Sequence, residues 1–183
     1  MDGIGRLTLR ATVGGYFVGH GLQKLTGWFG GAGLKGTGEF FESVGLRPGR
    51  ENALLAGAAE TGAGALLTLG LLTPVAASAL AGVMTNAIRH VHGKNGPWIT
   101  DGGFEHPAVV LAALAALTES GPGPLSLDAT LGTELKGLGT MALALGAGAA
   151  AAVLAAERGE QLAARPDADA ALSRAMEYVG AAS

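Results

Sequence analysis

One acidic residue stands out among those that could carry chemistry, because it interrupts an apolar stretch long enough for a membrane helix. Glu60 lies near the middle of the segment from Ala53 to Leu72, which contains no other charge. A carboxylate at the centre of such a helix costs about 2.5 to 3.5 kcal/mol unless it is paired or protonated. We expect a cationic partner, either Lys24, Arg89 or a histidine, or a proton-carrying role. A buried ion pair that only sets the register of the helices is an equal alternative.

Polar residues also recur at intervals of four near the N-terminus. Tyr16, His20 and Lys24 share one face of a helix, and Gln23 lies nearly on the same side. Such a face is expected to point into a helix bundle or a water-filled cavity, because lipid offers no hydrogen bonds. His20 is the sharper candidate for a functional role. Lys24 alone is better explained as a lysine that snorkels to the membrane surface, with Arg10 reaching the opposite surface.

A third polar cluster lies at the end of another apolar segment. Asn86, Arg89 and His90 share one helical face, and His92 follows one turn beyond Arg89. The cluster predicts a binding site for an anionic or quinone-like head group, in which a histidine exchanges protons. An ordinary basic helix end, stabilised by the helix dipole, explains the same spacing equally well.

Several other chemistries have little support in the composition. The chain contains no cysteine, which excludes disulfides, thiolate-bound zinc, iron–sulfur clusters and covalently attached haem. Haem held by His20 and either His90 or His92 is a weaker hypothesis, because no repeated-histidine pattern supports it. No His-Glu-x-x-His or comparable metal-ligand spacing occurs, so no metal site is predicted. The net charge of -3 and the lack of a basic run argue against nucleic acid as a partner.

The elements that must position these residues are apolar segments of helical length. Only 15% of the residues are charged, against about 25% in soluble proteins. We therefore predict an all-α fold, a transmembrane four-helix bundle with a fifth C-terminal transmembrane helix, in a multi-pass protein of the cell membrane. The four spans are predicted over Ile4 to about Trp28, Ala53 to Leu72, Val75 to Ile88 and Pro107 to Ser120, and the fifth over Gly137 to Ala156. The fifth is rich in alanine and glycine and only weakly hydrophobic.

Smaller features complete this prediction. The fourth span is short, so Glu105 and His106 are expected at membrane depth, shielded by the other helices. Glu39 to Val44 predicts an interfacial helix, and the last stretch of the charged tail after Glu157 predicts a short solvated helix. The positive-inside rule prefers an outside N-terminus, but the side of the tail depends on the fifth crossing, so the orientation stays open.

The order of these motifs resembles the DoxX family of small membrane proteins, over roughly Leu7 to Thr130. The motifs that carry the resemblance are His20-Gly21-Leu22-Gln23-Lys24-Leu25, Gly27-Trp28-Phe29-Gly30-Gly31, Phe40-Phe41-Glu42-Ser43-Val44-Gly45-Leu46, Ala59-Glu60-Thr61-Gly62, Val91-His92, the glycine-rich approach to Glu105, and Gly121-Pro122-Gly123-Pro124-Leu125-Ser126-Leu127-Asp128. The resemblance implies a four-helix membrane domain over residues 1–130. Residues 131–183 would be an extension that holds the fifth helix and a polar tail.

The resemblance also implies two functional hypotheses. Some relatives belong to quinone-linked oxidoreductase systems such as thiosulfate:quinone oxidoreductase, whereas distant relatives are thought to assist membrane-protein assembly. Under the first hypothesis the chain is a membrane subunit that binds quinone and receives electrons from a partner subunit. Its catalytic residues would be Glu60, His20 and His92, and its quinone-binding residues Lys24, Arg89, Asn86 and Glu105. Under the second it is a non-catalytic scaffold for a partner protein, and a lipid or sterol could occupy the polar pocket.

Overall fold

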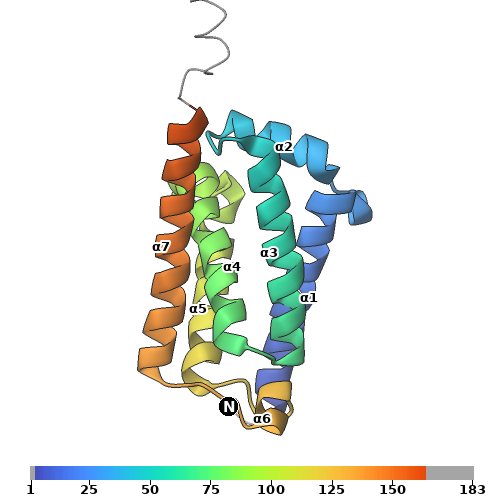
Figure 1. Ribbon diagram of the computed structural model, residues 1–183, viewed down its shortest axis with the longest axis vertical. Helices are drawn as coiled ribbons and strands as arrows, with labels where there is room; N and C mark the ends of the chain where they lie inside the picture. The colour runs from blue at the N-terminus through green and yellow to red at the C-terminus, as the bar shows by residue number, and fades with distance from the viewer. Residues whose placement is uncertain (1–2, 164–183) are drawn as a thin grey trace, which may run out of the picture.

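The computed structural model describes residues 3–163, and every regular element in this part of the chain is a helix (Figure 1). The predicted all-α fold is therefore confirmed. The long helices are α1 (Gly3–Thr26), α3 (Gly49–Leu69), α4 (Thr73–Ala87), α5 (Glu105–Ser120) and α7 (Leu138–Ala163), and the shorter ones are α2 (Gly33–Ser43) and α6 (Leu127–Leu131). The short turns are η1 (Trp28–Gly30), η2 (Ile88–His92), η3 (Gly93–Asn95) and η4 (Ile99–Asp101).

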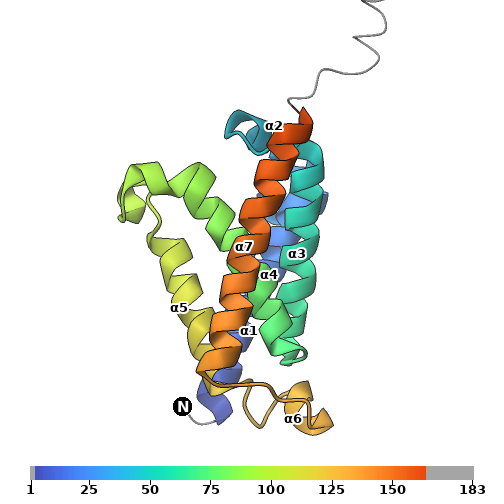
Figure 2. The same cartoon turned by 60° about the vertical axis from the view of Figure 1, so that its left-hand side comes forward.

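The long helices run lengthwise beside one another, and the two short helices lie at opposite ends of the bundle (Figure 1, Figure 2). We call these the α2 end and the α6 end. The N-terminus lies at the α6 end, and α7 finishes at the α2 end. Helix α1 packs along α3, and α4 contacts α3, α5 and α7. The hydrophobic core lies between these helices, around the fully buried Leu67, Leu80, Leu114 and Leu117.

Glycines allow α1 and α3 to approach closely. A Cβ atom added to Gly14 would lie 2.5 Å from the carbonyl oxygen of Gly64, and one added to Gly64 would lie 2.6 Å from the carbonyl oxygen of Gly14. Further along the same two helices, a Cβ atom added to Gly21 would lie 2.6 Å from the carbonyl oxygen of Gly57. Close backbone contact between small residues is the usual means of helix association in lipid, where burial of apolar surface provides little drive.

A polar cluster at the α6 end joins the α3–α4 turn to the chain between α5 and α7. The carboxylate of Asp128 accepts hydrogen bonds from the backbone N–H groups of Leu72 (2.9 Å) and Thr73 (3.0 Å), and from the hydroxyl groups of Thr73 (2.8 Å) and Thr133 (3.2 Å). These bonds satisfy the first N–H groups of α4, which have no partner inside the helix. Burial works to raise the pKa of Asp128, but these hydrogen bonds outweigh it and hold the pKa below its ordinary value.

Arg10 differs from its expected position at a membrane surface. Its side chain is only 1% exposed, and its Nη2 group donates to the carbonyl oxygen of Leu125. The segment that follows α5 folds across this end of the bundle and covers the guanidinium group. A long cationic side chain extends to the membrane surface when nothing inside the protein binds it. Here another part of the chain supplies the hydrogen-bond acceptor for Arg10.

Helix α7 is the one helix in residues 3–163 that is both long enough and apolar enough to cross a membrane by length and composition alone. It covers the stretch Gly137 to Ala156, in which only a weakly hydrophobic span was predicted. The other four predicted spans are all helical, but α4 and α5 have 15 and 16 residues, and α1 and α3 carry charges and many glycines. The predicted interfacial segment is helical within α2. The solvated helix predicted for the last stretch of the tail lies outside the described residues.

Candidate functional site

A cavity of about 1040 Å³ lies between α3 and α7. Helix α4 forms its floor, with Pro74 and Asn86 among the lining residues at its two extremes. The α3 wall includes Leu55 and Ala59, and the α7 wall is made mostly of alanine and glycine. The lining is therefore apolar along most of its length.

Polar side chains gather in one part of this cavity and come from four of the long helices and their continuations. They are His20 and Lys24 from α1, Glu60 from α3, Asn86 from α4 and His92 from the turn that follows it, and His106 from α5. Residues far apart in the chain thus share one site. A large apolar pocket with a few convergent polar groups is the usual form of a small-molecule site.

Glu60 and Lys24 form an ion pair at the centre of this cluster. The Lys24 Nζ atom lies 2.7 Å from Glu60 Oε2, and the side chains are 23% and 3% exposed, respectively. Lys24 is therefore the cationic partner that Glu60 requires, out of the several that the sequence offered. The lysine does not extend to the membrane surface, because the buried carboxylate holds its ammonium group inside the bundle.

His20 lies at the mouth of the cavity with a defined ring orientation. Its Nδ1 atom lies 3.0 Å from the side-chain oxygen of Gln23, which can only accept, so Nδ1 donates and Nε2 is left for a ligand. Gln23 in turn donates to the carbonyl oxygen of Phe29 at 3.2 Å. Tyr16 was predicted on the same inward face, but it is 71% exposed and lies outside the cavity lining.

The helix that carries Asn86 continues as a π-helical turn over Ile88–His92, and this changes which residues share a face. A wider turn rotates the chain less per residue, so Asn86 and His92 both line the cavity although their α-helical spacing would separate them. Arg89 instead forms an ion pair with Glu157 of α7, with 3.8 Å between Nη2 and Oε1. The face predicted for Asn86, Arg89 and His90 is therefore divided by the π turn.

His92 is fixed by the connection between α4 and α5. Its Nδ1 atom donates to the carbonyl oxygen of Gly102 at 2.7 Å, so its Nε2 atom is the nitrogen that a ligand could use. Glu105 does not line the cavity: its carboxylate accepts from the backbone N–H of Ile99 at 3.0 Å and closes a turn in the same connection. Its neighbour His106 lines the cavity instead. The sequence predicted that Glu105 and His106 alike would be shielded by the other helices, and only the structure distinguishes them, since His106 alone lines the cavity.

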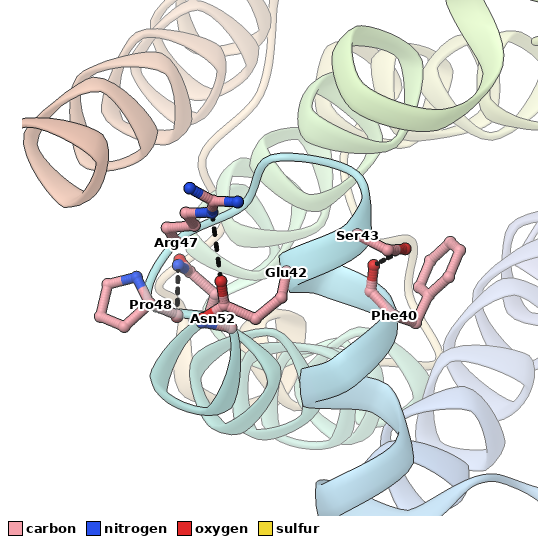
Figure 3. Close-up of polar contacts among 7 residues, drawn as sticks. Phe40, Glu42, Ser43, Arg47, Pro48 and Asn52 are labelled. Carbon is pink, nitrogen blue, oxygen red and sulfur yellow. Dashed lines mark hydrogen bonds and ion pairs between the residues drawn. The ribbon is translucent and has the colours of Figure 1, made fainter. Parts of the chain in front are cut away.

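Polar contacts hold the connection from α2 to α3 (Figure 3). Glu42 accepts from the backbone N–H of Gly49 at 2.6 Å and pairs with Arg47 at 3.2 Å, and Asn52 donates to the carbonyl oxygen of Pro48 at 2.8 Å. These bonds hold the end of α2 against α3. As a result Phe40, Phe41 and Leu46 form an apolar boundary of the cavity.

These features define a class of protein: an all-helical chain with at least one helix apolar enough for a membrane and with polar groups gathered inside an apolar cavity. Residues 5–93 match the model of the DoxX family, and this match supports the resemblance to this family of small membrane proteins. The matched part includes every polar residue of the site except His106. No curated protein and no solved structure matches the chain.

Proposed function

We propose that the chain is a multi-pass protein of the cell membrane, in which α1, α3, α4 and α5 form a four-helix domain within residues 1–130. Helix α7, within residues 131–183, would be a fifth crossing. At 1.5 Å per residue, α1 and α3 are about 36 and 31 Å long, and α4 with its π turn reaches about 30 Å. The hydrocarbon core of a bilayer is about 30 Å thick. These lengths support crossings by α1, α3 and α4 beside that of α7, whereas α5, with 16 residues, is about 24 Å long.

The charged residues on these helices are compatible with a membrane because other helices shield them. Glu60 is paired with Lys24, and Arg10 is covered by the segment after α5. Polar groups at membrane depth are tolerated where they pair with one another or with backbone carbonyl groups inside a bundle. A test by length and composition treats these charges as evidence against a membrane span. In the folded bundle, little of the surface of these charged groups would meet lipid.

The function that the site supports best is that of a membrane subunit in a quinone-linked oxidoreductase system. The observation that carries this proposal is the Lys24–Glu60 pair, placed with three histidines in an otherwise apolar cavity. A quinone has polar carbonyl groups on a ring and an apolar chain, so its two parts match the two parts of the lining. The cavity is at the upper end of the usual range for small-molecule sites, which is about 300 to 1,000 Å³.

The side chains of the site suggest distinct roles. Lys24 can donate a hydrogen bond to a carbonyl oxygen, and His92 can donate one from Nε2 in its imidazolium form, in which both ring nitrogens carry hydrogen. Both would stabilise the negative charge that develops there on reduction. Glu60 and His20 can relay the two protons that accompany two electrons in the conversion of quinone to quinol, each passing on a proton that it first takes up from the aqueous side. The electrons would come from a partner subunit. Asn86 offers a further hydrogen bond from α4.

A non-catalytic scaffold is the second candidate, and one observation favours it. Gly139 and Gly146 lie on α7, and a Cβ atom added to either of them would meet no other atom within 4 Å. These two glycines, with the exposed Leu143 between them, form an open face of this helix. Such a face is suited to close packing against a helix of another membrane protein.

The two proposals are tested by identifying what the purified protein holds. The protein is extracted in mild detergent, its small molecules are recovered in organic solvent, and they are identified by mass spectrometry. We expect stoichiometric quinone from the wild type and from Glu51→Gln, a control on the same helix away from the cavity. Glu60→Gln should lose it. The double variant Lys24→Met/Glu60→Leu replaces the buried pair with apolar groups that should preserve folding, and it should also lose quinone.

Two results would contradict the quinone proposal. One is quinone retained by a folded double variant. The other is a wild-type protein that carries no quinone and co-purifies with another membrane protein, which would favour the scaffold.

A further inference from the structure

We infer that α7 forms the second wall of a groove for a single hydrocarbon chain, so that the ligand is a single-chain amphiphile that reaches the site sideways from the bilayer, between α3 and α7. The inference rests on the membrane setting proposed above and extends the head-group site to the whole ligand. It also assigns a role to a helix that lies beyond residues 5–93, the part matched by the family model.

Helix α7 packs closely on α4, and the cavity separates it from α3. Gly148 of α7 packs against the backbone of Ser78, and a Cβ atom on Gly82 would lie 2.9 Å from the carbonyl oxygen of Gly148. This close crossing brings α7 down onto α4. The cavity then separates α7 from α3, with Ala151 and Ala152 on one side and Leu55 and Ala59 on the other.

The lining changes from polar to apolar along the groove. Pro74 and Asn86 both line it and are twelve residues apart in the sequence, which corresponds to about 18 Å along a helix. The polar side chains described above lie toward Asn86. Toward Pro74 the lining is mostly apolar and includes Val75, Leu135 and Leu143. Its polar side chains there are the small hydroxyl groups of Ser78 and Thr140, and that of Thr140 donates to the carbonyl oxygen of Lys136. A polar head group at one end and a chain along the rest would match this order.

The two ends of α7 are fastened, which leaves the side of the groove as the route for a ligand. At the α2 end, Gly159 packs against the carbonyl oxygen of Arg47, and Glu157 pairs with Arg89. At the α6 end, the backbone N–H of Gly137 donates to the carbonyl oxygen of Glu119 at 2.8 Å. Along the rims between these contacts, Leu55 and Leu143 are 66% and 76% exposed. Exposed leucines at the mouth of a membrane-embedded groove would meet lipid chains.

The test fills the groove from the α7 side without replacing any polar residue of the site. Ala151→Trp places an indole ring in the groove, whereas Ala150→Trp places the same ring on the same helix at an exposed position outside the lining. Affinity is measured in nanodiscs for two benzoquinones that share one ring, one with a decyl chain and one without. We expect the decyl compound to bind the wild type and Ala150→Trp more tightly. Ala151→Trp should lose about tenfold in affinity for the decyl compound alone.

The outcome separates this inference from the quinone proposal. If Ala151→Trp binds both benzoquinones as the wild type does, the groove inference is wrong, although the head-group site stands. If the wild type binds neither compound, the quinone proposal fails. The groove is then judged with the fluorescent fatty acid cis-parinaric acid, which should bind the wild type and Ala150→Trp but not Ala151→Trp. Equal binding by all three proteins, or by none, would overturn the inference.

Discussion

At the scale of single residues, two buried carboxylates have different surroundings. Glu60 sits among apolar residues in the middle of the bundle and has one cationic partner, Lys24, at 2.7 Å. Asp128 lies at the α6 end and accepts four hydrogen bonds from neutral groups. The first arrangement leaves a carboxylate beside a cavity, where it can act on a ligand. In the second, the oxygen atoms of Asp128 already accept hydrogen bonds from the protein, so its role is structural.

Asp128 should make the stability of the protein depend on pH in the acidic range. Its folded-state pKa lies below the ordinary value of 3.8, so the ionised form stabilises the fold. This contribution is complete above that value and is lost as the pH falls through the folded-state pKa. Asp128→Asn should lower the free energy of unfolding at neutral pH by about 2 kcal/mol.

The measurement is thermal unfolding in detergent at a series of pH values. The difference between the wild type and Asp128→Asn should shrink below about pH 4. Asp101→Asn, which alters an exposed aspartate, should follow the wild type at every pH. A difference that stays constant down to the lowest pH would show that the charge of Asp128 does not contribute.

At the scale of elements, the contacts between helices depend on glycines at particular positions. Gly14 faces α3, with no room for a Cβ atom, whereas a Cβ atom added to the adjacent Gly15 would meet no other atom within 4 Å. The same residue type therefore has opposite effects at neighbouring positions. At Gly14 it permits close packing, and at Gly15 it only reduces the intrinsic stability of the helix.

The two glycines provide a matched pair of substitutions. Gly14→Ala should destabilise the protein by about 1 to 3 kcal/mol, because α1 and α3 must move apart to accommodate the methyl group. Gly15→Ala should instead stabilise it by up to about 1 kcal/mol, because alanine favours the helix. Melting temperatures of the two variants, measured side by side in one detergent, check both signs. Equal effects would mean that the α1–α3 crossing is not as close as described.

At the scale of the whole molecule, positive charge is unevenly divided between the two ends. Figure 1 and Figure 2 place α2 and the end of α7 together, opposite α6 and the N-terminus. Lysine and arginine residues at or near the α2 end outnumber those at the α6 end; the first group is Lys24, Lys35, Arg47, Arg50, Arg89, Lys94 and Arg158, and the second is Arg6, Arg10 and Lys136. Excess positive charge marks the cytoplasmic side of a membrane protein.

The proposed membrane topology therefore has an inside α2 end and an outside N-terminus. Because the chain has no cysteine, single cysteines can report the side directly. Glu39→Cys at the α2 end should react with a membrane-impermeant maleimide only after the membrane is opened. Glu134→Cys at the α6 end should react in intact cells. The reverse pattern would invert the topology, and labelling of both in intact cells would argue against helices that cross from one end to the other.

Much of the fold could be predicted from the sequence, but the site could be predicted only in part. The predicted spans became α1, α3, α4, α5 and α7, because a helix forms from local hydrogen bonds within an uninterrupted apolar segment. The sequence also predicted that Glu60 needs a partner, because an isolated charge inside a membrane helix is unfavourable in free energy. The sequence did not show that His106 lines the cavity while Glu105 does not, nor that Asn86 and His92 share the cavity while Arg89 pairs with Glu157.

By itself, the sequence determined that this protein is helical, which segments form its helices, and that Glu60 needs a counter-charge. These properties follow from the cost of exposing or burying groups within one short segment of chain. Only the tertiary structure decided that Lys24 is the partner, that Arg10 is covered at the α6 end, and that a gap separates α3 from α7. Such features depend on how helices distant in sequence rotate and approach one another, and the close contacts at Gly14, Gly64, Gly82 and Gly148 set that geometry.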